Sequence, residues 1–448
     1  MFAWDRADSP PPVNARAAAP VVAAAPVVVG RHGEVSAAAA ERALAQFAER
    51  SASPTAVRAL IDDIGKLGAE PLYEDNSVEL LIDGPTTYRA MLDSIHAAKS
   101  HVHLETYIFS SDAVGQQFAD ALIERHRAGV AVRVLYDAVG SIESAPEFFA
   151  RLESAGVDVQ VYNALDPADP RSVASLATRD HRKILVVDGR VGFTGGINVS
   201  STYSRSSGGA AKQRNPAADG WRDTHILIRG PAVAGLQRLF LANWRAQGHE
   251  LADEATFFPR PAGHGGELVQ ILQASGGEGE FSAIYHAYLR AMELATERIW
   301  ITQAYFAPDE RFIETLRAAA RRHVDVRIIL PGVSDIGVVL YASRSRYGEL
   351  LREGVRLYES QGTVLHAKTA VIDGVWSTVG SSNLDYRSFL HNDEVNAIVL
   401  GQGFAARMES QFLVDAKAAK PVILEDWRQR PAADRVLEVL SGWIDNWL

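Results

Sequence analysis

The sequence predicts an α/β protein made of two similar lobes, and three observations support this prediction. Segments with the patterns of strands and helices alternate in both halves of the chain. A composite motif, H-x-K-x4-D-x6-G-[GS]-x-N, occurs twice, and its two histidines, His181 and His366, are 185 positions apart. The length of 448 residues is enough for two or three domains. Together these features indicate a duplicated unit with a largely central sheet in each copy.

The first half of the chain shows five elements in order. Residues 78–84 have the pattern of a strand, 86–100 that of a helix and 101–109 that of a second strand. A helix over 114–128 and a strand over 130–137 follow. Strands that alternate with helices of this length are typical of an α/β fold.

The second half repeats the same order. A strand over 267–275, a helix over 281–297 and a strand over 298–306 correspond to the first three elements. The helix at 311–322 and the strand at 324–331 complete the repeat. In each half a copy of the motif follows, and its stretch from Lys to Asp-Gly has the pattern of a buried strand that ends in a turn.

Composition shifts along the chain suggest where its domains begin and end. Residues 1–50 are expected to form a low-complexity, disordered leader that ends in a short helix near 37–50. The Pro/Gly-rich segment 255–266 marks the expected boundary between the lobes. We therefore assign residues 51–258 to the first lobe and residues 259–448 to the second, which ends in a C-terminal amphipathic helix.

Composition also narrows the class of protein. The chain has no cysteine, which excludes disulfides and thiolate metal sites. Its formal net charge of −10 argues against a polyanion such as DNA, so no nucleic acid is expected as a partner. The longest charge-free stretch, 17–30, is too short to span a bilayer and is interrupted by Pro20 and Pro26. The sequence therefore predicts no transmembrane helix.

The two motif copies place the same residue types at the same spacing. The first copy, HRKILVVDGRVGFTGGIN, contains His181, Lys183, Asp188, Gly195 and Asn198. The second copy, HAKTAVIDGVWSTVGSSN, contains His366, Lys368, Asp373, Gly380 and Asn383. A single copy would be explained by ordinary residues at the start of a strand. Two complete copies, each with one histidine and one lysine, indicate a site built around two histidines.

This pair of motifs resembles the HKD signature of the phospholipase D superfamily, and the flanking segments resemble its bacterial cardiolipin synthase branch. The likeness covers about residues 70–448, and the segments that support it are 101–109, 132–141, 220–233, 299–309 and 379–396. The resemblance implies two pseudo-symmetric α/β sandwich lobes of the phospholipase D type, with the active site at the lobe interface. It also implies that His181 and His366 lie in one cleft.

The motif residues suit attack on a phosphodiester, which is negatively charged and has a poor alkoxide leaving group. A neutral histidine can attack phosphorus while a protonated histidine gives its proton to the leaving alcohol. The resemblance assigns the covalent role to His181 and the acid/base role to His366. Lys183 and Lys368 are expected to supply positive charge to the non-bridging oxygens, so neither a metal nor another cofactor is expected.

Four further residues are expected to support this chemistry. Asn198 and Asn383 are suited to donate hydrogen bonds to the same oxygens. An imidazole needs a partner on its other nitrogen, and the family places a carboxylate downstream of each motif. Asp223 matches this position for the first copy and Glu394 for the second.

For two aspartates and two tyrosines the sequence gives a weaker indication of a role in the site. Asp188 and Asp373 complete the predicted catalytic set by the resemblance. Each of them follows a strand and precedes a glycine, however, which favours a turn or an ion pair over contact with substrate. Tyr107 and Tyr305 end the strands that precede the motifs and are compatible with either a site or a packing role.

The function that these features favour is phosphatidyl transfer, which makes cardiolipin from phosphatidylglycerol and a second phospholipid through a phosphohistidine. Phosphatidylethanolamine is left open as an alternative donor. The competing interpretations are a phospholipase D-type hydrolase, a nuclease and a non-catalytic membrane scaffold, the last being least favoured because both motifs are intact. We expect the protein to act peripherally at the cell membrane surface, on the cytoplasmic side. Its oligomeric state is left open.

The C-terminal segment has the pattern of an amphipathic helix. Its apolar face contains Val436, Leu437, Leu440, Trp443, Ile444, Trp447 and Leu448. Its opposite face contains Asp434, Glu438 and Asp445. The two tryptophans would suit an interfacial membrane anchor, which stays open as the alternative. Because acidic side chains are unfavourable beside anionic lipid, we favour packing of this helix on the second lobe. The loops at 163–178 and 201–219 are then the expected lipid contacts.

Overall fold

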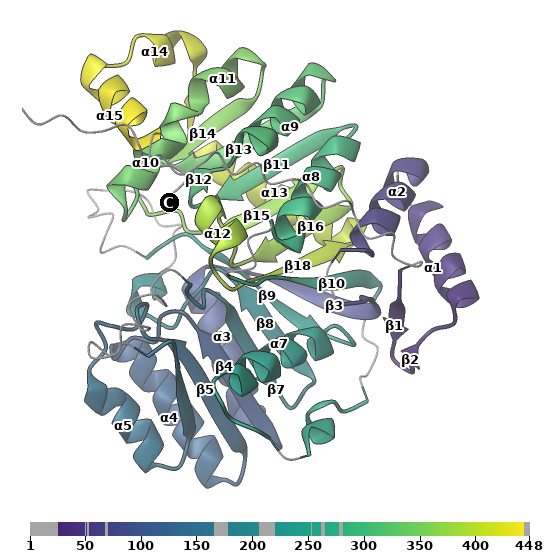
Figure 1. Ribbon diagram of the computed structural model, residues 1–448, viewed down its shortest axis with the longest axis vertical. Helices are drawn as coiled ribbons and strands as arrows, with labels where there is room; N and C mark the ends of the chain where they lie inside the picture. Colours follow the sequence, from purple (N-terminus) through teal and green to yellow (C-terminus); the bar gives the residue numbers. More distant parts are fainter. Residues whose placement is uncertain are drawn as a thin grey trace, which may run out of the picture.

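The structure is a computed structural model and describes residues 26–442, apart from residues 50, 52, 68–69, 165–177, 206–219, 252, 261–264 and 277–280. Within these residues the chain forms two α/β lobes stacked one on the other (Figure 1). The first lobe is blue and teal in the figure, and the second is green and yellow. This architecture confirms the predicted fold class.

The sheets of the two lobes have the same strand order. In the first lobe the order is β6 (Asp158–Tyr162), β5 (Ala131–Asp137), β4 (His101–Thr106), β7 (Lys183–Val187), β8 (Val191–Gly195), β9 (Thr224–Arg229) and β3 (Leu72–Ile82). In the second lobe it is β14 (Arg356–Ser360), β13 (Asp325–Pro331), β11 (Arg298–Gln303), β15 (Lys368–Ile372), β16 (Trp376–Gly380), β18 (Glu394–Leu400) and β10 (Glu267–Ala274). The strands β4, β5 and β6 are parallel, as are their counterparts β11, β13 and β14, and the other pairs in these two series are antiparallel. A duplicated unit accounts for this correspondence.

The two sheets join where the long strand β3 pairs with its counterpart β10. This pairing is antiparallel, with Asn76 opposite Glu267 and Tyr73 opposite Val269. Farther along, β3 pairs with β9 of its own lobe through residues 77–82. One strand therefore belongs to both sheets and connects the lobes by backbone hydrogen bonds.

Helices cover the sheets of both lobes (Figure 1). They are α3 (Asp83–Ala97), α4 (Ala113–Arg127), α5 (Pro146–Ser154) and α7 (Val233–Ala246) in the first lobe, and α8 (Ala283–Leu294), α9 (Glu310–Arg321), α10 (Gly337–Ser345), α11 (Tyr347–Arg352), α12 (Tyr386–Leu390) and α13 (Gln402–Ala418) in the second. Two of these helices reach across the junction, since α7 contacts β10 and α13 contacts β3. Leu236 of α7 and Phe404 of α13 belong to one buried apolar cluster with strands of both sheets. A shared hydrophobic core therefore fixes the lobes relative to one another.

The helix α9 illustrates how the sequence defines these elements. The carboxylate of Asp309 accepts a hydrogen bond from the backbone N–H of Phe312 and so caps the first turn. Phe312, Ile313 and Leu316 recur at helical spacing and are fully buried. All the strands and helices that local patterns predicted are present, and the largest difference is that β3 begins at Leu72 rather than at residue 78.

The N-terminal region departs from the predicted domain boundaries. Residues 1–25 lie outside the described residues, but β1 (Val28–Gly30) pairs in parallel with β3 and is part of the fold rather than of a leader. The expected short helix is present as α1 (Ala37–Glu49). The next helix, α2 (Pro54–Ile64), was assigned to the first lobe but packs against α8 and the core of the second. An amphipathic pattern shows that a helix is buried, not which neighbour buries it.

The chain ends in α14 (Leu424–Arg428) and α15 (Ala432–Gly442), which lie at the outer end of the second lobe (Figure 1). Although α15 contacts α10, the prediction that its apolar face packs on the lobe is wrong for the part that the structure describes. Val436, Leu437 and Leu440 are exposed, and Glu438 is buried instead. Residues 443–448 lie outside the described residues. Among those described, we find no helix with the length and hydrophobicity that crossing a membrane requires.

Candidate active site

Each motif copy forms a β-hairpin whose turn is made by its Asp-Gly pair. Asp188 and Gly189 join β7 to β8 with φ angles of 53° and 60°. Asp373 and Gly374 join β15 to β16 with φ angles of 50° and 65°. Two consecutive left-handed residues are typical of a type I′ turn, for which Asp-Gly is a preferred sequence. The motif histidines stand at the other end of each first strand, away from this turn.

The two motif aspartates bind backbone rather than reaching the histidines. Asp188 accepts hydrogen bonds from the amides of Lys99, Ser100 and His101. Asp373 accepts hydrogen bonds from the amides of Thr296, Glu297 and Arg298. Each carboxylate therefore ties its hairpin to the start of β4 or β11. This placement does not support the inclusion of Asp188 and Asp373 among the catalytic residues, and it favours the turn role.

Two short parallel bridges connect the lobes at the motif histidines. The backbone N–H of His181 donates to the carbonyl of Asp393 at 2.9 Å, and that of His366 donates to the carbonyl of Arg222 at 2.8 Å. Asp393 and Arg222 each immediately precede one of the two predicted carboxylates. The backbone therefore holds each histidine beside the carboxylate of the opposite lobe.

Both imidazoles bind a carboxylate from the other half of the chain. His181 Nδ1 lies 3.0 Å from both carboxylate oxygens of Glu394, and His366 Nδ1 lies 2.8 Å from Asp223 Oδ2. From the sequence, each carboxylate was expected to serve the motif copy that precedes it. This expectation is wrong, because each carboxylate binds the histidine of the other copy. With Nδ1–H bound to a carboxylate, the lone pair lies on Nε2, which becomes the nitrogen available for chemistry.

The variable position of the motif, Gly196 in the first copy and Ser381 in the second, faces the carboxylate of its own lobe. A Cβ atom on Gly196 would lie 2.2 Å from Asp223 Oδ1, so a side chain there would displace this carboxylate. In the second copy the Ser381 hydroxyl donates a hydrogen bond to Glu394. The same position therefore makes room for one carboxylate and stabilises the other.

Lys183 and Lys368 are buried beside the imidazoles. The Nζ of Lys183 donates to the carbonyl of His181 at 2.6 Å, and that of Lys368 donates to the carbonyl of His366 at 2.5 Å. Burial lowers the pKa of Lys183 to about 7 and the pKa of Lys368 to about 8, because it disfavours the charged form. A negatively charged phosphate in the site would stabilise the charged form of both.

Burial also lowers the pKa of both histidines. For His181 the pKa falls well below the ordinary range, and the charges of Lys183, Lys368 and His366 lower it further. Burial raises the pKa of Glu394 to about 7. His181 is therefore neutral at neutral pH, which is the form that a nucleophile requires.

Tyr107 and Tyr305 occupy equivalent places in the two lobes, next to the histidines. The ring centroids of Tyr107 and His181 are 5.0 Å apart, and those of Tyr305 and His366 are 6.4 Å apart. The ammonium groups of the motif lysines lie 5.3 Å and 5.9 Å from the same two tyrosine rings. These contacts place both tyrosines at the site and resolve the choice that the sequence left open.

Two aromatic residues beside His366 were missed by the sequence analysis. The rings of Tyr203 and Trp221 lie 5.7 Å and 5.2 Å from that imidazole. Neither has a residue of its own type at the matching position of the other copy, so the repeat gave no signal. Asn198 Nδ2 donates to the Tyr203 hydroxyl at 3.1 Å, which directs this amide toward the tyrosine. The Oδ1 atom of Asn383 is buried and has no hydrogen-bond partner among the described residues.

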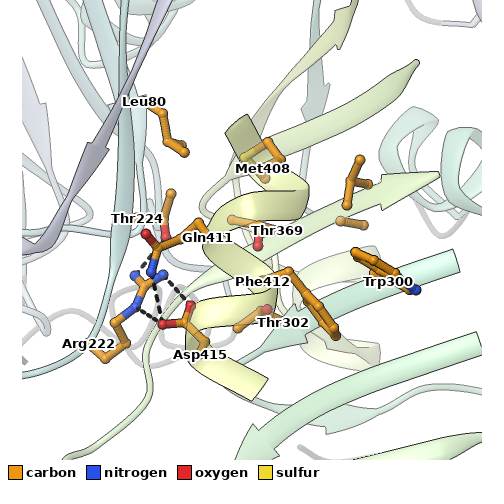
Figure 2. Close-up of a pocket in the computed structure, with 12 residues that line it drawn as sticks. Leu80, Arg222, Thr224, Trp300, Thr302, Thr369, Met408, Gln411, Phe412 and Asp415 are labelled. Atoms are coloured by element: carbon orange, nitrogen blue, oxygen red, sulfur yellow. Dashed lines mark hydrogen bonds and ion pairs between the residues drawn. The ribbon is translucent and has the colours of Figure 1, made fainter. Parts of the chain in front are cut away.

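The segment that carries Asp223 is held from the second lobe by a partly buried ion pair (Figure 2). Arg222 Nη2 lies 2.6 Å from Asp415 Oδ2 of α13, and Arg222 Nη1 donates to Thr224 Oγ1 at 2.9 Å. The pair borders a small pocket lined by residues of α13 and of strands from both lobes. Because the carbonyl of Arg222 binds the amide of His366, this ion pair supports both members of one imidazole–carboxylate pair. Sequence reasoning missed it, since an arginine and an aspartate 193 positions apart form no pattern.

Comparison with known proteins agrees with this geometry. The model of the family described as "Cardiolipin synthase, PLD-like domain" matches residues 91–207 and 288–415, one segment in each lobe and each with one motif copy. The chain belongs to this family. A cardiolipin synthase of Geobacillus sp. (strain WCH70) is 36% identical to it over 385 residues, which cover 86% of this chain and 75% of that relative.

A second relative and a solved structure extend the comparison. The major cardiolipin synthase ClsA of Bacillus subtilis (strain 168) is 36% identical over 372 residues, which cover 82% of this chain and 74% of the relative. The crystal structure of phosphatidylserine synthase from Haemophilus influenzae Rd KW20 is 13% identical, with a TM-score of 0.63 over 83% of this chain and 95% of that chain. This likeness shows that the two proteins share a fold.

Proposed function

We propose that this protein is a phosphatidyl transferase that makes cardiolipin from phosphatidylglycerol, with a second phospholipid as the acceptor. The observation that supports this most directly is the pair of buried histidines, each bound through Nδ1 to a carboxylate of the other lobe. One lysine lies beside each histidine. Membership of the cardiolipin synthase family supports the same reaction.

In the first half-reaction, Nε2 of His181 attacks the phosphorus of the donor lipid. The N–P bond forms as the bond from phosphorus to the headgroup oxygen breaks. His366, which takes up a proton on Nε2 when the anionic phosphate enters the site, gives that proton to the departing oxygen. Glycerol leaves, and the phosphatidyl group stays on His181 as a phosphohistidine. The carboxylate of Glu394 stabilises the positive charge that develops on the imidazole.

In the second half-reaction, the now neutral His366 takes a proton from a free hydroxyl of a second phosphatidylglycerol. The hydroxyl oxygen attacks phosphorus, the N–P bond breaks, and cardiolipin leaves while His181 returns to its neutral form. Lys183 and Lys368 assist both steps by placing positive charge beside the non-bridging oxygens, where negative charge develops. Water as the acceptor would instead give phosphatidic acid, which is the product of a hydrolase.

Incubation of the purified protein with phosphatidylglycerol labelled in its phosphatidyl group is expected to yield labelled cardiolipin and unlabelled glycerol. Thin-layer separation distinguishes cardiolipin from phosphatidic acid. Labelled phosphatidylethanolamine mixed with unlabelled phosphatidylglycerol as the acceptor tests the alternative donor in the same assay. A His366→Asn variant, similar in volume, is the control for contaminating enzymes. Phosphatidic acid as the only labelled product would contradict transfer and favour hydrolysis.

Turnover is expected to be unchanged in excess EDTA. The reason is that Lys183 and Lys368 provide the positive charge that a divalent ion would otherwise place on the phosphate. The initial rate of cardiolipin formation is compared before and after dialysis against the chelator. A rate that falls in EDTA and recovers when Mg²⁺ or Ca²⁺ is added would show that the lysines are not sufficient.

The proposed substrates also suggest where the protein works. Since both lipids reside in a bilayer, we propose that the protein binds the surface of the cell membrane from the cytoplasmic side. Fractionation of cells, followed by extraction of the membranes with carbonate or high salt, would test this peripheral association. Protein that resists both extractions would contradict it.

A further inference from the structure

The helix α15 has the reverse of the usual orientation of an amphipathic helix. Its apolar face, defined here as Val436, Leu437, Val439 and Leu440, is 57%, 42%, 56% and 52% exposed. The two buried residues of the helix, Glu438 and Ser441, are polar. Amphipathic helices of soluble proteins normally turn the apolar side to the core. A contiguous exposed apolar face of this kind indicates a surface for a partner.

The charges near the α15 apolar face favour a partner that is anionic as well as apolar. Glu438 is buried against Arg430, whose Nε lies 3.0 Å from its carboxylate, so this acidic group does not face a partner. The adjacent surface hollow between α11 and α14 is lined in part by Arg352, Arg428, Arg430 and Trp427. Arg352 and Arg428 are exposed, and Glu425 and Asp426 in α14 offset part of their charge. Of the acidic side chains that argued against lipid contact, Glu438 is therefore turned inward and Asp434 is partly buried. The exposed Arg352, Arg428 and Arg435 lie on α15 or in the adjoining hollow.

The helix α15 is linked to the site described above through α10. α15 contacts α10, and α10 contacts β12 (Phe306–Ala307) (Figure 1). The carboxylate of Asp335, which precedes α10, accepts a hydrogen bond from the Tyr305 hydroxyl at 2.8 Å. The ring of Tyr305 in turn stands next to His366 and Lys368. The helix α10 therefore connects α15 with the residues that we propose to handle phospholipid.

The sequence that follows α15 matches the same kind of partner. The six residues after Gly442 read WIDNWL and lie outside the described residues. Two of the six are tryptophans, a residue type enriched where lipid meets water. A bilayer surface therefore fits this end of the second lobe better than a polar protein partner does.

We propose that the α15 apolar face docks the protein on a bilayer that contains anionic phospholipid. This inference rests on the proposed function, because the lipid substrates are found in that bilayer. The four apolar side chains enter the boundary between headgroups and acyl chains, and Arg352 and Arg428 face the anionic headgroups. The loops that the sequence analysis expected to contact lipid lie mostly outside the described residues.

Sedimentation of the full-length protein with vesicles of phosphatidylglycerol and phosphatidylcholine tests this proposal. The test variant carries Leu437→Asp and Leu440→Asp. The matched control carries Leu413→Asp and Val414→Asp on α13, where both residues are exposed to a similar degree, 47% and 62%. We expect the α15 variant to bind vesicles at least about tenfold more weakly and the control to bind as the parent does. Vesicles of pure phosphatidylcholine should bind the parent more weakly and with less dependence on salt.

Two further measurements make the result unambiguous. Circular dichroism and cardiolipin formation from phosphatidylglycerol in detergent micelles should be unchanged in the α15 variant, because neither leucine lies at the active site. Unaltered vesicle binding by this variant would overturn the proposal, as would a dimer that it converts to a monomer while vesicle binding persists. A parent protein that binds vesicles through α15 but makes no cardiolipin in micelles would instead contradict only the proposed function.

Discussion

Replacing His181 or His366 with alanine is expected to lower kcat for cardiolipin formation on the order of 10⁴-fold or more. Each variant removes one half of a coupled nucleophile and acid, and neither half completes the reaction without the other. The double variant should therefore be little worse than either single one, because the two groups act as a unit. Rates from labelled phosphatidylglycerol would measure this. Effects that multiply in the double variant would show that the histidines act independently.

The two single variants should differ when the donor lipid carries a leaving group that needs no acid. With a phosphatidyl ester of p-nitrophenol, the His366→Ala variant should still release one equivalent of p-nitrophenol in a burst. The His181→Ala variant should release none, because it has no nucleophile. The opposite pattern, or a labelled phosphopeptide that contains residue 366 rather than 181, would reverse the assigned roles.

Removal of the Lys368 ammonium is expected to raise the activation barrier by about 2–4 kcal/mol, comparable to the loss of one oxyanion donor. The matched variant Lys183→Ala should have a similar effect, since both groups occupy equivalent places. Lys368→Arg should recover little activity, because a planar guanidinium does not fit the space of a compact ammonium. Values of kcat/KM for the three variants would test this, and full rescue by arginine would contradict a specific role for the ammonium.

The low pKa of Lys368 also gives its contribution a characteristic pH dependence. Since this pKa is about 8 in the folded protein, the free enzyme loses the charge as pH rises through that value, and kcat/KM should fall. The corresponding fall in kcat should lie at higher pH, because phosphate bound in the enzyme–substrate complex stabilises the charged form of Lys368. Burial of the Lys368 ammonium disfavours folding fully below about pH 8, and this cost disappears as pH rises from about 8 to the unfolded pKa of 10.5, because the unfolded chain then keeps a proton that the folded chain has lost. Loss of activity without loss of thermal stability would separate this titration from unfolding.

Local sequence patterns were sufficient for the elements and for the two hairpins. The continuous apolar run between Lys183 and Asp188, followed by glycine, predicts both the strand and its turn. The same pattern from Lys368 to Asp373 gave the second hairpin. Repetition then showed which polar residues belong together, because chance does not place two histidines and two lysines at one common spacing.

What local patterns could not supply is the partner of each element across space. Nothing around Glu394 indicates that it meets His181 rather than His366, because that choice depends on how two complete sheets join at β3 and β10. The orientation of α15 is similar: periodicity identifies an apolar face but not the direction in which it points. The partly buried Arg222–Asp415 pair depends on the same tertiary contacts and has no repeat to reveal it.

Because the imidazole–carboxylate pairs are crossed, a substitution in one half of the chain affects the histidine of the other half. A substitution at Asp223 alters the first half of the sequence, yet its chemical consequence falls on His366 in the second. A substitution at Glu394 has the reciprocal effect on His181. Neither half of the duplicated sequence can therefore diverge, be exchanged with that of a relative or be lost while the other half keeps a working histidine. The two halves of the duplicated sequence therefore have to change together if both histidines are to keep their carboxylate partners.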